Sequence, residues 1–365
     1  MNKVNKDLLE LYSDYLLSSF THVTATGLSA MTAGEVSHDK ITRFLASEQM
    51  DSRALWRLVK PMVRQVEEVE GDEGVLVIDD TIEEKPYTDE SELLCWHYDH
   101  SKGRSVKGVN LISALYEVGG TREVSIPVAF ELVKKSEWVF DEKKGKWRRK
   151  SLKTKNELYR EMLRACHKNR LKFRYVLSDV WYSASENMAY IKEGLDKEFI
   201  MPLKSNRKVA LSAEDKQRGA YERVASLELE PDTVREVYLE QVRFPLLLLK
   251  QIFKNEDGSE GVLYLVSSDM TLDYERLTTI YQRRWKVEEY HKSLKSNASL
   301  AKSPAKTART QSNHVFASIW SFVKLEWMKL ATSMNHFALR SRLRVKAVQA
   351  AFGELQDLRL SQARA

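Results

Sequence analysis

The sequence holds few cysteines and no long apolar run. Its 365 residues include only Cys95 and Cys166, which stand far apart in the chain. Two distant cysteines suggest neither a disulfide framework nor a cysteine zinc site, so a reducing compartment is expected. No apolar run reaches the roughly 18 residues that a membrane helix needs, and the amphipathic N-terminal segment lacks a signal-peptide cleavage pattern. We therefore expect a cytoplasmic protein that has no membrane partner.

A glycine-rich phosphate loop is also missing, so the sequence gives no reason to expect ATP use. There is no internal repeat and no low-complexity segment. The hydrophobic content of 43% and the charged content of 30% are typical of a globular protein. A chain of this length can form two or three domains with a sizeable core.

Positive charge is distributed unevenly along the chain. Residues 281–365 contain 16 Lys and Arg against 5 Asp and Glu, whereas the first 280 residues sum to −5. A second cluster, KKGKWRRKSLKTK at 143–155, has 8 positive residues in 13. A solvated lysine-rich surface could account for one such cluster. Two clusters, with Trp147 and Trp285 interleaved, favour nucleic acid as the partner.

Residues 1–70 show the apolar periodicity of helices. Within them, SAMTAGEVSHDKITRFLAS predicts a helix-turn-helix in which Gly34 makes the turn and Ser37 caps the second helix. His38, Lys40 and Arg43 would then project from that second helix and could contact DNA. Many helical hairpins that do not bind DNA have a similar pattern.

Strand patterns begin after the helical region. Apolar runs predict strands at 75–78, 109–116, 125–132, 174–179 and 199–203, and helices are expected at about 154–169 and 184–194. The resulting order, βββαβαβ, is that of the ribonuclease H-like fold, an α/β class. Residues 206–268 contain three further strand patterns and predict a β-rich insertion.

This pattern divides the chain into four predicted parts. Residues 1–70 would form a helical, DNA-binding domain, and residues 71–205 with 269–300 would form the ribonuclease H-like core. The β-rich insertion covers 206–268, and a basic helical C-terminal region covers 301–365.

One helical stripe carries four polar side chains in the run TIYQRRWKVEEYHKSLKSN. Tyr281, Arg284, Glu288 and Lys295 are separated by 3, 4 and 7 residues, so a continuous helix would place them on one face. Arg284 and Glu288 also form an ordinary i, i+4 pair, which is common on solvated helices. The alternative is a site in which Glu288 binds metal and the three other side chains grip phosphates.

Two aspartate positions lie at the ends of predicted apolar strands, Asp79 (with Asp80) and Asp179. Carboxylates at strand ends lie where open α/β sheets bind ligands. Together with Glu288 they could hold two Mg²⁺ ions, which favour oxygen ligands and support in-line phosphoryl transfer.

These motifs resemble those of bacterial DDE transposases of the insertion-sequence-four family. The spacing from Tyr281 to Lys295 matches the tyrosine-arginine-glutamate-lysine signature of that family. The run VIDDTIEEKP resembles its first motif, an apolar strand followed by Asp-x-Thr, and VLSDVWYSASEN resembles its second. The likeness covers about residues 75–300.

The resemblance implies a catalytic, metal-binding triad of Asp79, Asp179 and Glu288, with Mg²⁺ as cofactor and Mn²⁺ as a possible substitute. Asp79 is preferred over Asp80 because Thr81 fixes the Asp-x-Thr frame, although strand position does not separate the two.

The implied activity is cleavage of the 3′ ends of an insertion sequence, followed by joining of those ends to target DNA. The partners would be double-stranded DNA, as terminal inverted repeats and target, and a second copy of the chain in a synaptic complex associated with the bacterial nucleoid. Tyr281, Arg284 and Lys295 would contact phosphates. Two alternatives are a transposase remnant that represses transcription and a ribonuclease H-like nuclease that cuts without strand transfer.

Overall fold

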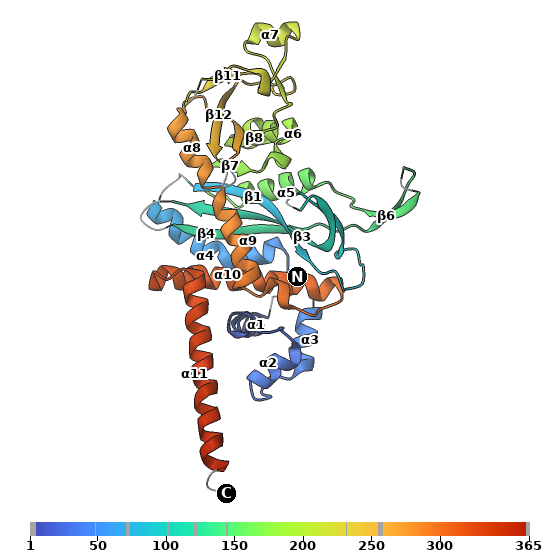
Figure 1. The fold of residues 1–365 in the computed structure, drawn as a ribbon, viewed down its shortest axis with the longest axis vertical. Helices are drawn as coiled ribbons and strands as arrows, with labels where there is room; N and C mark the ends of the chain where they lie inside the picture. The colour runs from blue at the N-terminus through green and yellow to red at the C-terminus, as the bar shows by residue number, and fades with distance from the viewer. Residues whose placement is uncertain are drawn as a thin grey trace. The chain divides into compact units, whose positions relative to one another are not determined.

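A computed structural model describes most of the chain and divides it into two compact units (Figure 1). Unit 1 comprises Met1–Leu58, Ile82–Val109 and Glu289–Ala365, and unit 2 comprises Val59–Thr81 and Asn110–Glu288. The residues described are 5–47, 49–70, 74–100, 102–119, 123–143, 145–230, 232–254 and 258–362.

Unit 2 is built on a mixed β-sheet. Along the sheet the strands follow the order β11-β12-β13-β8-β7-β1-β3, and β4 pairs with β3. Two of them, β1 and β3, also contribute residues to unit 1. The strands are β1 (Gly74–Glu84), β3 (Arg104–Val118), β4 (Val124–Leu132), β7 (Phe173–Ser178), β8 (Glu198–Leu203), β11 (Arg235–Val237), β12 (Leu246–Lys254) and β13 (Glu260–Ser267).

Five of these strands have the order and direction of a ribonuclease H-like core. Strands β3 and β4 are antiparallel, β1 and β7 are parallel, and β7 and β8 are parallel. The first buried run, from Val75 to Ile78, has no exposed surface, as expected for a central parallel strand. The predicted fold class is confirmed.

The segment predicted as a β-rich insertion extends this same sheet. Strand β13 pairs antiparallel with β8, as in the pair Val266 and Met201, and β12 and β11 follow outward. Residues 206–268 therefore lengthen the edge beyond β8. A small ladder of β9 (Lys208–Val209) with β10 (Glu222–Arg223) lies within them, as does the short helix α7 (Ala213–Arg218).

Local sequence signals explain where the helices of unit 2 begin. Helix α5 (Lys155–Lys168) starts with a capping box, in which Thr154 and Glu157 bond each other's backbone N–H groups. Asp273 caps α8 (Tyr274–Gln282) by accepting from the Arg276 backbone. Three further elements are the 3₁₀ turn η1 (Val180–Tyr182), α6 (Ser185–Ala189) and the π-helical η2 (Tyr190–Gly194) that continues it.

A two-stranded hairpin in unit 2 was not anticipated from strand patterns. It consists of β5 (Glu137–Asp141) and β6 (Lys146–Lys150), which pair only with each other in a separate sheet. It includes much of the predicted basic cluster at 143–155.

Unit 1 is largely helical. Its long helix α10 (Ala308–Thr332) is mostly buried, and Asn313 connects it to the N-terminal helices by donating to the Leu45 carbonyl and accepting from the Met50 backbone. Residues from both predicted helical ranges, 1–70 and 301–365, thus belong to one unit. Its other elements are α1 (Lys6–Ser18), α2 (Ala25–Met31), α3 (His38–Ala46), β2 (Cys95–Asp99) and α11 (His336–Gln362); α4 (Ser52–Glu70) and α9 (Trp285–Ser296) contribute to both units.

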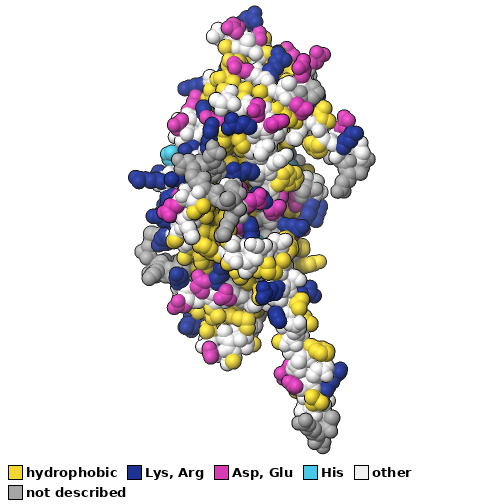
Figure 2. All heavy atoms as spheres, turned by 90° about the vertical axis from the view of Figure 1, so that its left-hand side faces the viewer, with side chains coloured by type: hydrophobic (Ala, Val, Ile, Leu, Met, Phe, Trp, Pro, Cys, Tyr) yellow, Lys and Arg dark blue, Asp and Glu magenta, His cyan; other side chains and the backbone are white. Residues whose placement is uncertain are grey.

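Helix α11 leaves most of its length exposed. Only His336, Leu339 and Arg340, at its start, are buried. Apolar side chains mark the remainder of the helix, which projects at the bottom of Figure 2. None of the helices among the described residues is long and apolar enough to cross a membrane.

Candidate active site

Two aspartates are brought together by neighbouring parallel strands of unit 2. Ile78 of β1 pairs with Ser178 of β7, so Asp79 and Asp179 are the next residues along two adjacent strands. The repulsion between them contributes to the raised pKa of Asp79. Strand β7 ends at Ser178, one residue before the predicted end at Asp179, whereas β1 continues to Glu84. The prediction that Asp79 ends its strand is therefore wrong, because only the fully buried part of β1 ends there.

The neighbouring carboxylates Asp79 and Asp80 have different surroundings. Successive side chains of a strand point to opposite faces. Asp80 accepts three side-chain hydrogen bonds: from Asn110 Nδ2 at 2.8 Å, Lys155 Nζ at 2.7 Å and Tyr182 OH at 2.9 Å. Asp79 accepts one from the Asp80 backbone N–H at 2.8 Å and lies near Arg284. Asp80 is thus held by a polar network, whereas Asp79 Oδ2 faces the Arg284 guanidinium at 3.5 Å.

The pKa values of the pair follow from these contacts. Burial, and then the charge of Asp80, raise the pKa of Asp79 to about 7. Burial also acts to raise the pKa of Asp80, but Lys155, Asn110 and Tyr182 outweigh it and bring that pKa below the usual value. Asp80 is therefore a stable anion, while Asp79 titrates near neutrality.

The four signature residues do not share one continuous helix. Helix α8 ends at Gln282, and α9 begins at Trp285. At the join, the Arg284 N–H bonds the Tyr281 carbonyl at 2.9 Å, and the Val287 N–H bonds the Arg284 carbonyl at 3.1 Å. These i→i−3 bonds are of the 3₁₀ type. The predicted single stripe is corrected accordingly: Tyr281 closes one helix, Arg284 lies at the join, and Glu288 lies in the first turn of the next.

Arg284 connects two of the three predicted triad carboxylates. Its Nη1 lies 3.5 Å from Asp79 Oδ2 and 3.6 Å from Glu288 Oε1. The guanidinium also lies 5.9 Å from the Tyr281 ring centroid and 5.2 Å from that of Trp285. Its side chain is only 12% exposed, and its Nε is buried with no hydrogen-bond partner among the described residues. A cation thus already lies between Asp79 and Glu288, and one of its donors is unused.

Tyr281 is almost fully buried beside this arginine. Burial raises the pKa of Tyr281 to about 12, although Arg284 acts to lower it. Burial likewise acts to lower the pKa of Arg284, but Tyr281 and Asp79 outweigh it and raise that pKa. The phenol is therefore a neutral hydrogen-bonding group, and the guanidinium is a permanent charge.

The donor set suits a hard divalent cation. Asp79, Asp179 and Glu288 offer only oxygen ligands, as Mg²⁺ prefers. Burial, and then repulsion by Asp80, raise the pKa of Asp79 to about 7, and a divalent cation would relieve that repulsion. The described residues contain no group of three or more His, Cys, Asp or Glu side chains already gathered closely enough to bind an ion. Arg284 occupies part of the space between two of the carboxylates instead.

The fourth signature residue, Lys295, belongs to unit 1. It lies in the last turn of α9, and its Nζ donates to the Ile82 carbonyl at 3.1 Å. Its charge also acts to lower the pKa of Glu83, which burial raises above the usual value.

The predicted helix-turn-helix is present in unit 1. Helices α2 and α3 are joined through Gly34, whose φ of 83° favours glycine. The Ser37 side chain caps α3 by accepting from the Lys40 N–H. His38, Lys40 and Arg43 are exposed on α3, while its opposite face is buried. The predicted surface positions of all three residues are confirmed; their contact with DNA remains a prediction.

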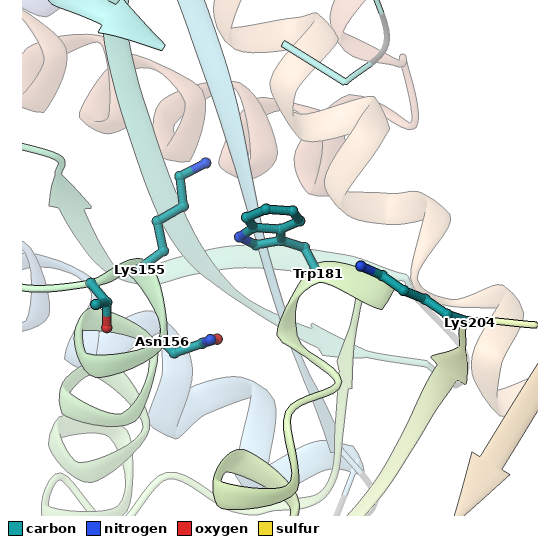
Figure 3. A pocket seen from close by; sticks show the side chains of 5 residues that line it. Lys155, Asn156, Trp181 and Lys204 are labelled. Atoms are coloured by element: carbon teal, nitrogen blue, oxygen red, sulfur yellow. The ribbon is translucent and has the colours of Figure 1, made fainter. Parts of the chain in front are cut away.

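A cavity of about 390 Å³ lies beside the second aspartate motif in unit 2. In Figure 3, Trp181 projects between Lys155 and Lys204, and the Lys204 Nζ lies 5.6 Å from its ring centroid. Trp181 is 44% exposed and comes two residues after Asp179. The cavity thus offers an aromatic surface and two amines near the carboxylates, and its lining residues are Thr154, Lys155, Asn156, Trp181 and Lys204.

Sequence reasoning did not identify the partners of Asp80. Asn110 is a polar residue within an otherwise apolar strand, which is a weak signal that it bonds something buried. Lys155 was visible only as part of a basic cluster, and Tyr182 only as an aromatic near Asp179. Sequence spacing does not indicate that these three converge on one carboxylate.

Comparisons with known proteins identify a family that matches much of the chain. A family described as "DDE superfamily endonuclease" matches residues 2–241. Among solved structures, the Mos1 strand transfer complex is 15% identical, with a match covering 55% of this chain and 58% of that one at a TM-score of 0.18. No curated protein matches the sequence.

Proposed function

Since the chain belongs to the DDE superfamily endonucleases, we propose that it is a DNA transposase. It cleaves the 3′ ends of an insertion sequence and joins them to target DNA by Mg²⁺-dependent phosphoryl transfer. The observations that carry this proposal are the ion pairs of Arg284 with Asp79 and Glu288 and its electrostatic interaction with Asp179. The finer placement in the insertion-sequence-four family rests on the spacing from Tyr281 to Lys295.

Asp79, Asp179 and Glu288 would bind the metal. Two Mg²⁺ ions would activate the attacking oxygen and stabilise the leaving oxygen of an in-line displacement. Asp79 is favoured over Asp80 because the Asp80 oxygens already accept bonds from three side chains. Asp80 would fix the backbone that positions Asp79.

Arg284 would orient the scissile phosphate. A guanidinium can donate two parallel hydrogen bonds to a phosphate, and the Arg284 Nε has no partner among the described residues. While DNA is absent, its charge balances Asp79 and Glu288. Tyr281 would donate its phenolic proton to a neighbouring phosphate, and Lys295 would supply a further positive charge.

The DNA partners would be the terminal inverted repeats and the target. Helix α3 presents His38, Lys40 and Arg43 on its exposed face, as a recognition helix would. The cavity around Trp181 adds Lys204 as a phosphate contact, while the Lys155 that also lines it is held by Asp80.

Helix α11 supports a homodimer as the working form. Its exposed residues Val345, Val348, Phe352 and Leu355 are separated by 3, 4 and 3 residues, which is the a/d spacing of a helix pair. A second copy of α11 would cover this row.

Substitution of Glu288 tests the activity. We expect Glu288→Gln to reduce cleavage of a transposon-end duplex to background while DNA binding persists, because one metal-binding carboxylate is lost. Glu289→Gln, on the next residue of α9, is the matched control and should retain cleavage. Near-normal cleavage by Glu288→Gln would exclude the triad.

A nuclease that cuts without joining is the second candidate, since the matched family is described only as an endonuclease. Supplying a pre-cut 3′ end together with a target plasmid separates the two functions. Joined product supports the transposase, and cleavage of uncut ends without any joining supports the nuclease.

A further inference from the structure

The two faces of the β5–β6 hairpin carry different kinds of side chain. Residues that pair across the two strands point to the same face. The pairs Trp138–Arg149 and Phe140–Trp147 alternate along the hairpin with the pairs Glu137–Lys150, Val139–Arg148 and Asp141–Lys146. One face therefore carries three aromatic rings and a guanidinium. The other carries Arg148, paired with Asp141 at 3.1 Å, and the cross-strand neighbours Glu137 with Lys150.

The aromatic face remains open although its members touch one another. Trp147 packs edge-on against Phe140 with ring centroids 5.5 Å apart, and the Arg149 guanidinium lies 4.5 Å from the Trp138 ring centroid. Even so, Trp138, Phe140 and Trp147 are 53%, 47% and 63% exposed. Three large rings at this exposure on one ribbon form a surface suited to a partner.

The hairpin is not part of the large sheet of its own unit, and it extends away from α5 and β3 in Figure 1. The aromatic contacts help to hold a ribbon that would be marginal alone. Hairpin stability therefore accounts for the packing between the rings. It does not account for the area that they leave in solvent.

Charge indicates which partner fits this surface. From Glu137 to Lys150 the sequence holds six Lys and Arg against three Asp and Glu. A second copy of this ribbon would bring like charges together, and one hairpin is small beside the roughly 800 Å² per partner of a standard interface. A polyanion is attracted by the same charge. Flat rings with flanking cations bind single-stranded nucleic acid, in which bases stack on the rings and phosphates pair with the cations.

We propose that the β5–β6 hairpin binds unpaired nucleotides of the DNA substrate through Trp138 and Trp147. Arg149 holds the Trp138 ring and contributes positive charge beside it. In a duplex each base stacks on its neighbours, so its faces are not accessible to the tryptophan rings. The hairpin therefore prefers strands whose bases are unpaired. The inference rests on the proposed function, which makes DNA the substrate, and it adds the form of DNA that this surface takes.

The test measures binding of the full chain to a fluorescein-labelled oligo-dT strand and to a duplex of equal length by anisotropy. Stacking contributes roughly 1–3 kcal/mol per base, so Trp138→Leu with Trp147→Leu should weaken oligo-dT binding by about tenfold or more. Duplex affinity should stay unchanged, because helix α3 and the carboxylate site are intact. Trp138→Tyr with Trp147→Tyr keeps the rings and should retain oligo-dT binding.

A control separates stacking from other effects. Trp96→Ala removes a tryptophan of similar exposure, 54%, from strand β2, and should leave oligo-dT affinity as it is. Anisotropy reports binding and requires no cleavage, so failure of the cleavage proposal would not affect this measurement.

Three outcomes would overturn the inference. They are unchanged oligo-dT affinity in the leucine pair, an equal loss for duplex and single strand, and a loss of self-association in sedimentation with DNA affinity intact. The last would assign the face to a second copy of the chain.

Discussion

The two sides of strand β1 just after Ile78 differ sharply. On one side, Asp80 accepts bonds from Asn110, Lys155 and Tyr182, and its pKa lies below the usual value. On the other, Asp79 accepts from the Asp80 backbone N–H and lies 3.5 Å from Arg284 Nη1, and its pKa is raised to about 7. One carboxylate is saturated with hydrogen bonds, whereas the other faces the Arg284 guanidinium. Hydrogen-bond saturation, rather than position in the motif, therefore distinguishes Asp80 from Asp79, the residue that we propose binds metal.

The largest expected effect is on stability as pH changes. Ionisation of Asp79 opposes folding because its pKa rises from 3.8 to about 7 in the folded chain. The contribution of Asp79 to the free energy of unfolding is therefore fully present below pH 3.8 and is lost as the pH rises through 7. This rise in pKa corresponds to a loss of roughly 4 kcal/mol of unfolding free energy at high pH.

Urea unfolding in the presence of a chelator checks this contribution. Relative to the native chain, Asp79→Asn should gain stability progressively from acid to alkaline pH. Asp80→Asn should show no such gain, since the pKa of Asp80 is lowered. A parallel pH dependence of the native chain and Asp79→Asn would contradict the comparison.

Removal of the lysine that holds Asp80 should give the next largest effect. Lys155→Met leaves a buried carboxylate without its charged partner, which costs about 3 kcal/mol of unfolding free energy. Lys153→Met is the control, because Lys153 pairs with Glu161 at the surface with 53% of its side chain exposed, and such pairs contribute about 0–1 kcal/mol. Equal midpoints of urea unfolding for the two variants would show that Asp80 does not depend on Lys155.

A smaller effect is expected for Arg284, which lies beside Asp79. Arg284→Lys keeps the charge near Asp79 but loses the two-pronged geometry, so the cleavage rate should fall by about tenfold. Arg283→Lys is the matched control, because the Arg283 Nη2 donates to the Glu117 carbonyl at 2.7 Å. Single-turnover cleavage rates measure both. A normal rate for Arg284→Lys would limit Arg284 to balancing charge.

Much of the fold follows from local signals in the sequence. The buried run at 75–78, the turn at Gly34 and the cap at Ser37 each depend on near neighbours, and the structure confirms them. Strand periodicity also located 199–203, yet it could not reveal that residues 206–268 extend the same sheet. That pairing joins Val266 to Met201, and nothing local specifies it.

The candidate site was only partly predictable for the same reason. The sequence spacing predicted that Tyr281, Arg284 and Glu288 lie close together. That prediction assumed one continuous helix, whereas the chain forms i→i−3 hydrogen bonds between two helices. The frame Asp-x-Thr favoured Asp79 without a physical reason. That reason lies in the hydrogen bonds to Asp80, whose donors Asn110 and Lys155 come 30 and 75 residues later in the chain.

Metal binding by variants of the two aspartates tests the central claim most directly. Titration calorimetry with MnCl₂ at alkaline pH, where Asp79 is ionised, compares the native chain with Asp79→Asn and Asp80→Asn. The account predicts that Asp79→Asn loses metal binding and Asp80→Asn retains it. Retention of binding by Asp79→Asn, together with its loss in Asp80→Asn, would contradict the account.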